Sequence, residues 1–298
     1  MNITKKGRRI MNIVDKMYLD TYREIKENGI SDKDQDVRPR WADGTPAYTK
    51  AVFGRVHRYD LSKGFPILSL RRIAWKTALD EILWIWQKKS NRVDDLNSRI
   101  WDAWATYRDS EGYATIGKAY GYQLGRKIDF PEGTMDQVDR VLYLLKNNPG
   151  SRRIVTNIFN HDELDEMGLQ PCAYGTNFSV KGGRLNMVLI QRSGDYLTAA
   201  GPGSFNVVQY ALLMHMFAHV SDLEVGELLH VVTDLHVYDR HFDIIDKMVD
   251  HNEGGQEREL PKLKIGRRVD NFYDFKIDDF QLEGYETDYS TGRIEVAE

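Results

Sequence analysis

The side chain in this sequence that could most readily do covalent chemistry is Cys172, the only cysteine of the chain. It lies near the start of residues 171–180, which together with residues 185–196 are rich in Val, Ile, Tyr, Phe and Thr, a composition typical of strands. The Lys181–Arg184 segment between them contains paired glycines and predicts a hairpin turn. We therefore expect Cys172 to open the first strand of a hairpin.

The same hairpin predicts the surroundings of the thiol. Once the chain turns, Gln191, Arg192 and Ser193 at the end of the second strand return beside Cys172. A guanidinium close to a thiol stabilises the thiolate, which is the nucleophilic form. A lone cysteine is more often a small buried apolar residue. The Arg-Ser pair and the loop that follows, residues 198–204, favour the chemical interpretation here.

A second candidate is a carboxyl group within an apolar helix. Residues Ile73–Ser90 predict a long helix in which Glu81 lies among Ala, Leu, Ile and Trp side chains. A carboxylate in such surroundings is costly unless it has a partner or a function. The alternative, which the sequence leaves open, is a narrow polar edge that Glu81 shares with Lys76, Lys88 and Lys89.

Three polar side chains alternate along a later apolar segment. In VVTDLHVY, residues 231–238, a strand would place Asp234, His236 and Tyr238 on one face. Packing alone does not explain three polar groups on one face of an apolar strand. They suit hydrogen bonds to a sugar hydroxyl.

Arginines occur where an anion could recruit them. Residues 36–48 contain two prolines, a glycine and Arg38, so they predict an ordered loop that exposes a cation. A loop arginine is more often simply solvated. Arg152 and Arg153 precede a predicted strand, and adjacent strand residues point to opposite faces. At most one of this pair readily serves a site in its own subunit, so the other could act across an interface.

Aromatic residues gather between positions 100 and 122. Trp101 and Trp104 are three residues apart, and Tyr120 and Tyr122 flank a glycine. Aromatic side chains at such spacing are most often part of a core. They also provide flat walls on which a heterocycle can stack.

One histidine pair raises the question of a metal. Residues 205–220 predict a long apolar helix with His215 and His219 one turn apart. The usual metalloprotease pattern needs a Glu directly after the first His, and Met216 stands there. We therefore expect no metal.

The elements that must position these groups fit a single domain, residues 1–298. This length allows one sizeable core, no segment is typical of a linker, and 41% hydrophobic residues indicate an ordinary soluble globular protein. The net charge of -4 argues against nucleic acid as a partner. One cysteine allows no internal disulfide, which fits a cytoplasmic location. Without a run of about eighteen apolar residues or an apolar region after the basic N-terminus, we expect no membrane span or signal peptide.

Together these groups fit covalent chemistry on a phosphorylated heterocycle better than peptide hydrolysis, because no histidine shows a recognisable pattern with the cysteine. Along nearly its full length the sequence resembles the thymidylate synthase family. The motifs that carry this resemblance are the Glu81 helix, IWDAW at 100–104, SRR at 151–153, PC at 171–172, QRSGD at 191–195, FN at 205–206, DLEVGE at 222–227 and DLHVY at 234–238.

The resemblance implies an α+β fold, with a large mixed β-sheet flanked by helices and the sheets of two subunits packed together in a homodimer. It also implies an activity. Cys172 would add to C6 of the uracil ring of dUMP, and C5 would then attack the methylene of the co-substrate 5,10-methylenetetrahydrofolate. Loss of the C5 proton and transfer of hydride from the folate would yield dTMP and dihydrofolate.

Residue by residue, the resemblance implies a nucleotide site. The phosphate would be held by Arg38, Arg192 and Ser193, joined by Arg152 and Arg153 of the partner subunit. Asn206 would read the pyrimidine edge, since its amide matches the donor and acceptor pattern of uracil at N3 and O4. The sugar hydroxyl would bind His236 and Tyr238, and Gln191 would complete the substrate-binding set.

The resemblance likewise implies the groups that do chemistry and the groups that bind folate. Glu81 would relay protons through water, and Tyr120 would help to remove the C5 proton. With Cys172, Arg192 and Asn206 they make up the expected catalytic set. The folate site would be lined by Trp101, Trp104 and Asp195, with the carboxylate binding the pterin.

Three features depart from the family pattern. Ala173 follows the cysteine where many members have His, the loop at 196–205 is longer than usual, and the chain ends in Glu298 where many members end in an apolar residue. The loop and the end lie on the cofactor side, where exclusion of water protects a reactive intermediate.

These departures keep two alternatives open. In a pyrimidine nucleotide hydroxymethylase acting on dUMP or dCMP, water captures the C5 methylene and tetrahydrofolate is released. Trp101 favours the synthase, because it can shield the intermediate. A non-catalytic nucleotide-binding relative is the third interpretation, and the intact set of Cys172, Arg192 and Asn206 argues against it.

Overall fold

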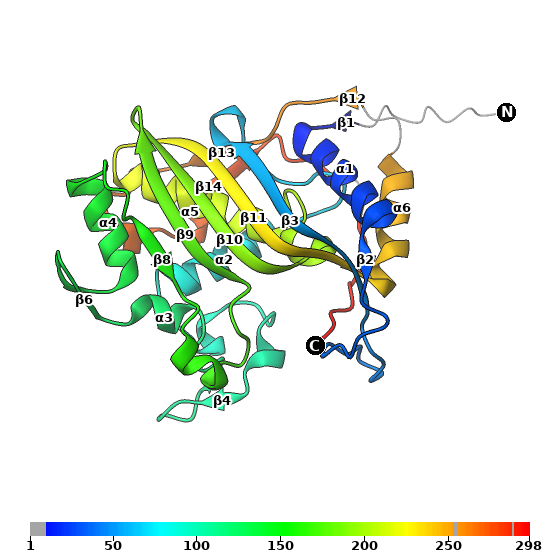
Figure 1. Cartoon of the computed structure of the whole chain (residues 1–298). Coiled ribbons are helices and arrows are strands. Elements are labelled where there is room, and N and C mark those ends of the chain that lie inside the picture. The colour runs from blue at the N-terminus through cyan, green and yellow to red at the C-terminus, as the bar shows by residue number, and fades with distance from the viewer. Residues whose placement is uncertain (1–9, 253–255, 288) are drawn as a thin grey trace.

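A large mixed sheet forms the centre of the computed structural model, which describes residues 10–252, 256–287 and 289–298 (Figure 1). Most of the basic N-terminal segment lies outside these residues. The sheet has the order β2-β3-β11-β10-β9-β8. Its strands are β2 (Ile30–Ser31), β3 (Thr49–Asp60), β8 (Val155–Asn157), β9 (Ala173–Lys181), β10 (Arg184–Asp195) and β11 (Glu224–Tyr238). Strands β10 and β11 run parallel and the other neighbours antiparallel, so the predicted mixed sheet is confirmed.

Shorter elements surround this sheet. The two-stranded pairs are β1 (Ile10–Met11) with β12 (Gln256–Glu257), β4 (Tyr107–Arg108) with β5 (Ala114–Thr115), β6 (Ile128–Phe130) with β7 (Gly133–Met135), and β13 (Lys262–Ile265) with β14 (Phe280–Glu283). The α-helices are α1 (Ile13–Asn28), α2 (Trp75–Trp86), α3 (Gly121–Gly125), α4 (Gln137–Asn147), α5 (Phe205–Val220) and α6 (Phe242–Asn252). Short 3-10 turns occur at Leu61–Lys63, Val93–Asp95, Asp102–Trp104, His161–Glu166, Asp239–His241, Phe272–Asp274 and Ile277–Asp279.

Helices α2 and α5 pack against each other behind one face of the sheet (Figure 1). The α5 sequence is apolar on all sides and its middle is fully buried, as expected for a helix in a large core. Helix α1 begins after Asn12, whose side chain accepts hydrogen bonds from the backbone N–H groups of Val14 and Asp15. Within the described part of the chain, no helix combines the length and the apolar character needed to cross a bilayer.

The opposite face of the sheet has no helix over it (Figure 1). Apolar residues that remain partly or fully exposed form a patch on this face, where cross-strand register places Val188 next to Leu229 and Ile190 next to Val231. Val56 of β3, opposite Val231, is 53% exposed. An apolar sheet face of this kind is typical of a surface that another layer covers.

The predicted hairpin is confirmed. Strands β9 and β10 are joined by Gly182 and Gly183, which have φ values of 56° and 75° and so form the left-handed turn that glycine favours. The register places Gln191 opposite Ala173, one residue after the cysteine. The turn sets the pairing as far as Ile190, and a register shift between Ile190 and Gln191 then brings Arg192 opposite Cys172.

Two local predictions are wrong. The sequence of residues 64–72, GFPILSLRR, has a Gly and a Pro before and within an apolar run and so predicts a turn followed by a short strand, but the segment contains no strand. Phe65, Ile67 and Leu68 are buried there because they fill the core, and no neighbouring strand is available to pair with them. The segment after Asp195, predicted as a loop, forms a π-helical turn at Tyr196–Ala200.

Candidate active site

A cavity of about 550 Å³ brings the predicted site residues together. Its walls come from α2, α5, the ends of β10 and β11, the loop before β3 and the last three residues of the chain. The predicted residues that line it are Arg38, Glu81, Trp101, Trp104, Tyr120, Cys172, Gln191, Arg192, Ser193, Asp195, Asn206, His236 and Tyr238. Arg152 and Arg153 are exposed and do not line this cavity.

Cys172 lies directly before β9, and Arg192 holds it in place. The backbone N–H of Arg192 donates to the carbonyl of Cys172 at 2.9 Å, and a guanidinium nitrogen lies 3.8 Å from Sγ. The guanidinium also donates to the carbonyls of Pro171 and Gln170, which fixes its position. Burial raises the pKa of the thiol, while the charges of Arg192 and Arg38 act in the opposite direction. The predicted neighbourhood of thiol and cation is confirmed, although burial has the larger effect.

Tyr120 connects the thiol to the aromatic wall. Its hydroxyl accepts a hydrogen bond from the backbone N–H of Cys172 at 3.1 Å. Its φ of 44° is unusual for a residue other than glycine, and such conformations collect at functional sites. The ring contacts Trp101 edge to face at 5.0 Å between centroids, and Trp101 contacts Trp104 in the same way at 5.5 Å. Burial, followed by the charge of Cys172, raises the Tyr120 pKa, so the phenol stays protonated.

Glu81 faces the cavity and is buried, so it does not lie on a polar edge with lysines. Burial raises the pKa of its carboxyl to about 7. The nearby side chains of Gln209 and Trp101 lower this pKa, and the charge of Asp80 raises it further. A carboxyl group that titrates near neutral pH can both accept and release a proton.

Asn206 belongs to a chain of buried polar groups. Its Oδ1 accepts a hydrogen bond from Gln191 Nε2 at 3.1 Å, and its Nδ2 donates to Gln209 Oε1 at 2.9 Å. Beyond Gln191 the chain reaches His230, whose Nε2 lies 2.8 Å from Gln191 Oε1. Sequence reasoning missed Gln209 and His230. A signal was available, because Gln209 stands one helical turn after Asn206 in an otherwise apolar helix.

The alternation on β11 places Asp234, His236 and Tyr238 at the cavity wall, as predicted. His236 Nδ1 lies 2.6 Å from Asp234 Oδ1, and the rings of His236 and Tyr238 meet edge to face at 5.1 Å. This pairing fixes the imidazole with its other nitrogen free for a ligand. Burial, followed by the charge of Asp195, raises the pKa of Tyr238, which keeps its hydroxyl a donor.

Asp195 ends β10 and caps the π-helical turn. Its side chain accepts hydrogen bonds from the backbone N–H groups of Leu197 and Thr198 and from the Thr198 hydroxyl. His241 Nδ1 lies 3.7 Å from Asp195 Oδ1. Burial opposes ionisation, but His241 and Thr198 outweigh it and hold the pKa of Asp195 below its usual value. The site therefore presents a partly buried, ionised carboxylate to the cavity that Trp101 and Trp104 also line.

The C-terminal segment closes one side of the cavity. Glu298 and Arg40 exchange two backbone hydrogen bonds of 2.7 and 2.9 Å, and Ala297 packs against Trp41. His241 Nε2 lies 2.8 Å from the carbonyl of Glu295. Although the sequence ends in a charged residue, its backbone docks at the cavity.

The two histidines of α5 lie in different surroundings. His219 Nε2 accepts a hydrogen bond from the backbone N–H of Val269 at 3.1 Å, whereas His215 is partly buried beside Phe65. Among the described residues, no group of three or more His, Cys, Asp or Glu side chains could hold a metal ion.

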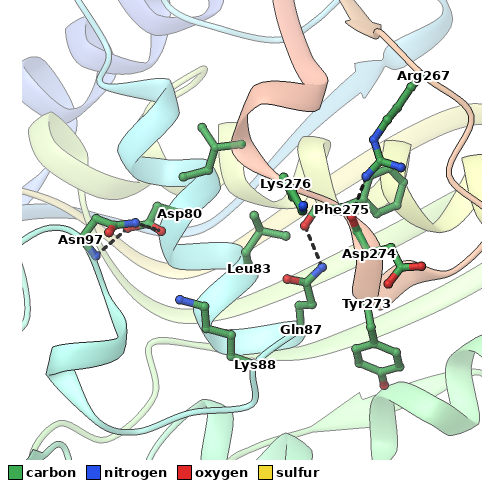
Figure 2. A pocket seen from close by; sticks show the side chains of 11 residues that line it. Asp80, Leu83, Gln87, Lys88, Asn97, Arg267, Tyr273, Asp274, Phe275 and Lys276 are labelled. Carbon is green, nitrogen blue, oxygen red and sulfur yellow. Dashed lines mark hydrogen bonds between the residues drawn. The ribbon is translucent and has the colours of Figure 1, made fainter.

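A second cavity, of about 610 Å³, lies between α2 and the segment at 273–277 (Figure 2). Figure 2 shows Gln87 pointing at this segment, where its Nε2 donates to the carbonyls of Phe272 and Phe275 at 3.0 Å each. Asp80 is occupied by two hydrogen bonds from Asn97. This cavity includes none of the predicted site residues, and its polar groups mainly fasten the C-terminal part of the chain to α2.

Comparison with known proteins agrees with the geometry. The family model described as thymidylate synthase matches residues 16–297. Thymidylate synthase 1 of Bacillus subtilis strain 168 is 46% identical over 280 residues, which cover 92% of this chain and 96% of the relative. The thymidylate synthase of Bacillus phage phi3T is 44% identical over the same length.

Among solved structures, the thermostable thymidylate synthase A from Bacillus subtilis superposes with a TM-score of 0.84 at 44% identity. The match covers 95% of this chain and 99% of that one. Since sequence and structure agree over nearly the full length, the chain belongs to the thymidylate synthase family.

Proposed function

We propose that the protein converts dUMP and 5,10-methylenetetrahydrofolate to dTMP and dihydrofolate. The observation that carries this proposal is the assembly of Cys172, Arg192, Asn206, Glu81 and Tyr120 around one cavity in a member of this family. The relatives compared above are named thymidylate synthases, which supports methylation as the reaction.

Cys172 is the proposed nucleophile. Its thiolate adds to C6 of the uracil ring, which makes C5 a carbon nucleophile, and the same S–C6 bond breaks when the product leaves. Because burial raises the pKa of the thiol, the approach of Arg192 and Arg38 is what favours the thiolate. The need for a free thiol also leads us to infer a cytoplasmic location.

The arginines divide the phosphate site between two subunits. Arg38, Arg192 and Ser193 line the cavity and would bind the phosphate from within the subunit. Arg152 and Arg153 lie outside it, so we propose that they reach the site of the partner in a homodimer. The uncovered apolar face of the sheet supports such a dimer, because a second copy would bury it.

The base and the sugar meet groups of fixed polarity. Asn206, which Gln191 holds in place, retains one N–H and one lone pair for the pyrimidine edge. His236 and Tyr238 offer hydrogen bonds to the sugar hydroxyl. Glu81 and Tyr120 lie on the side of the thiol and the aromatic wall, and we assign proton transfer at C5 and O4 to them through ordered water.

The folate fits the remainder of the cavity. Trp101 and Trp104 provide a flat wall, and the Trp101 Nε1 is buried without a hydrogen-bond partner among the described residues. Asp195 supplies a carboxylate for the pterin. When bound, the folate would supply the one-carbon unit and the hydride. The docked C-terminal segment would help to exclude water.

The deciding experiment is the mass of the nucleotide formed from dUMP and 5,10-methylenetetrahydrofolate, with dCMP in a parallel reaction. We expect a methylated product from dUMP together with dihydrofolate. A hydroxymethylated product with tetrahydrofolate would show that water enters the site and would overturn the proposal.

The Cys172→Ser variant is the matched control. We expect it to bind dUMP while turnover falls at least about 1000-fold, since a hydroxyl is a far weaker nucleophile at neutral pH. Binding without turnover by both the wild type and the variant would instead identify a non-catalytic relative.

A further inference from the structure

We propose that His230 and Gln209 are positioning residues that fix the amide direction of Asn206 and thereby make the site select uracil over cytosine. Neither residue is needed to contact the base. They form the two ends of a buried chain, His230–Gln191–Asn206–Gln209, in which each side chain hydrogen-bonds the next. The inference rests on the proposed use of dUMP and adds the means by which the base is chosen.

The carbonyl of Ser193 is one of three groups, with His230 and Gln209, that favour the observed direction of this hydrogen-bonded chain. Gln191 Nε2 lies 2.9 Å from the carbonyl oxygen of Ser193, which can only accept a hydrogen bond. The nitrogen of this amide is therefore on the Ser193 side, and the same nitrogen donates to Asn206 Oδ1. Reversal of the Gln191 amide would place two oxygens against each other.

The direction then passes to Asn206. Because Oδ1 accepts from Gln191, Nδ2 must point toward Gln209, whose Oε1 accepts from it at 2.9 Å. One hydrogen of Nδ2 and one lone pair of Oδ1 remain for a ligand. Uracil offers an N3–H donor and an O4 acceptor, which match this pair. Cytosine offers an N3 acceptor and an N4 amino donor, which require the reversed amide.

His230 holds the first end of the chain. Since Gln191 Oε1 is an acceptor, His230 Nε2 must carry the hydrogen, which fixes the imidazole tautomer. The ring is fully buried on β11, between the sheet and the core. Burial, followed by the charge of the neighbouring His57, lowers the pKa of His230 to about 3, so the ring stays neutral at neutral pH.

Gln209 holds the second end and links it to Glu81. Gln209 Oε1 accepts a hydrogen bond from Asn206, so Gln209 Nε2 is left on the side of Glu81, whose pKa Gln209 lowers. This Nε2 is buried and has no hydrogen-bond partner among the described residues, so it is available as a donor on that side. Reversal of the hydrogen-bonded chain would turn the Gln209 oxygen toward the Glu81 carboxyl. Glu81, the proposed proton relay, and Asn206, which would bind the base, therefore favour the same direction of the chain.

The test compares the binding of dUMP and dCMP by wild type, His230→Phe and Gln209→Met, measured calorimetrically. Each variant removes one end of the chain and allows Asn206 to turn. We expect the ratio of dCMP to dUMP dissociation constants to fall about tenfold or more in both, because a reversed Asn206 suits cytosine. His230→Gln keeps an N–H donor for Gln191 and should retain most of the wild-type ratio.

His215→Phe is the matched control for loss of stability. His215 is a histidine of α5 whose Nε2 is buried, whose pKa burial lowers to about 4, and which lies outside the hydrogen-bonded chain. We expect it to reduce the melting temperature without changing the binding ratio. An unchanged ratio in His230→Phe and Gln209→Met, with dUMP still bound, would overturn the inference. The proposed function is tested by a different assay, product formation from dUMP by the wild type. Failure of that assay would overturn the proposed function, whereas the ratio of dissociation constants tests only the role of His230 and Gln209.

Discussion

At the scale of single residues, burial decides the chemistry of the carboxyl groups. Glu81 and Asp195 line the same cavity, yet burial raises the pKa of the first to about 7, and the second stays ionised because His241 and Thr198 outweigh its burial. Carboxyl groups whose environments separate their pKa values can take different roles in one site. Here one suits proton transfer and the other suits binding of a neutral heterocycle with N–H donors.

The Glu81→Gln variant tests this difference. At pH values between the ordinary pKa of 4.5 and about 7, Glu81 keeps its proton in the folded protein but loses it in the unfolded chain. Stability conferred by this site therefore falls as pH rises through that window. We expect Glu81→Gln to exceed wild type in unfolding free energy by about 1–3 kcal/mol at pH 8 and to differ little near pH 4.5, while turnover falls roughly 100-fold.

Denaturant unfolding at several pH values measures that effect. The variant cannot ionise, so its difference from wild type should grow from pH 5 to pH 8. A difference that stays constant over this range would contradict a carboxyl pKa near 7 in the folded protein. Turnover measured on the same samples separates the catalytic loss from the stability change.

At the scale of elements, the site is built where strand ends meet the C-terminal segment. The β9–β10 hairpin brings Arg192 to Cys172, and the C-terminal backbone pairs with Arg40 beside the same cavity. His241 lies between Asp195 and the carbonyl of Glu295, so the Asp195 carboxylate and the C-terminal segment share one neighbour. Closure of the cavity thus depends on an element far away in sequence.

Deletion of residues 296–298 tests this closure. It removes the Glu298 pairing with Arg40 and the contact of Ala297 with Trp41. We expect the KM for folate to rise about tenfold and kcat to fall, with dUMP affinity changed less than about threefold, since the nucleotide contacts remain. Steady-state kinetics with each substrate varied in turn makes the comparison.

Arg240→Gln is the control for that deletion. Arg240 is partly exposed and forms ion pairs with Glu295 and Asp43 next to the same segment, and it does not line the cavity. Exposed pairs contribute little, so this variant should behave like wild type. Equal folate kinetics in the deletion variant and wild type would show that the end of the chain is not part of the folate site.

At the scale of the whole molecule, one subunit leaves two features without a function. The apolar face of the sheet, with Val56, Val188 and Val231, has no covering layer, and Arg152 and Arg153 lie outside the cavity. The homodimer that we propose would account for both, because packing of the two sheets would bury the face and bring the arginine pair toward the partner.

Mixing of inactive subunits tests the shared site. Cys172→Ser lacks the nucleophile, and Arg152→Ala with Arg153→Ala lacks the cations proposed to act in the partner. In a mixed dimer, one site combines an intact Cys172 with arginines from the other subunit. We expect activity to rise from near zero to roughly a quarter of wild type, half of the dimers being mixed and each holding one complete site. No gain after refolding together would place the arginines in their own subunit.

We also propose that residues 1–298 fold as a single domain. Buried apolar residues from α1 through β14 form one continuous cluster, including Tyr18, Trp84, Phe217 and Phe280. A shared core predicts one cooperative calorimetric transition at fixed protein concentration. Two transitions, one of them abolished by a change confined to residues 91–135, would instead indicate separate folding units.

The sequence by itself determined those parts of the protein that depend on near neighbours. The Gly182–Gly183 turn set the β9–β10 register as far as Ile190, because a two-residue turn of this type has one geometry, and so returned the end of β10 to the region of Cys172. The apolar pattern of 205–220 gave the bounds of α5, and alternation in β11 put His236 and Tyr238 on the cavity side. The family motifs identified the rest of the cavity-lining set.

Tertiary structure decided everything that depends on which elements meet. Residues 64–72 looked like a strand, but an apolar run becomes a strand only where a neighbour can pair with it. Two of the contacts in the site join residues that are 39 or more positions apart: His230 with Gln191, and Glu298 with Arg40. The burial of Glu81 follows from contacts of the same kind. Local pattern shows which face of an element is apolar, whereas packing alone determines what lies against it.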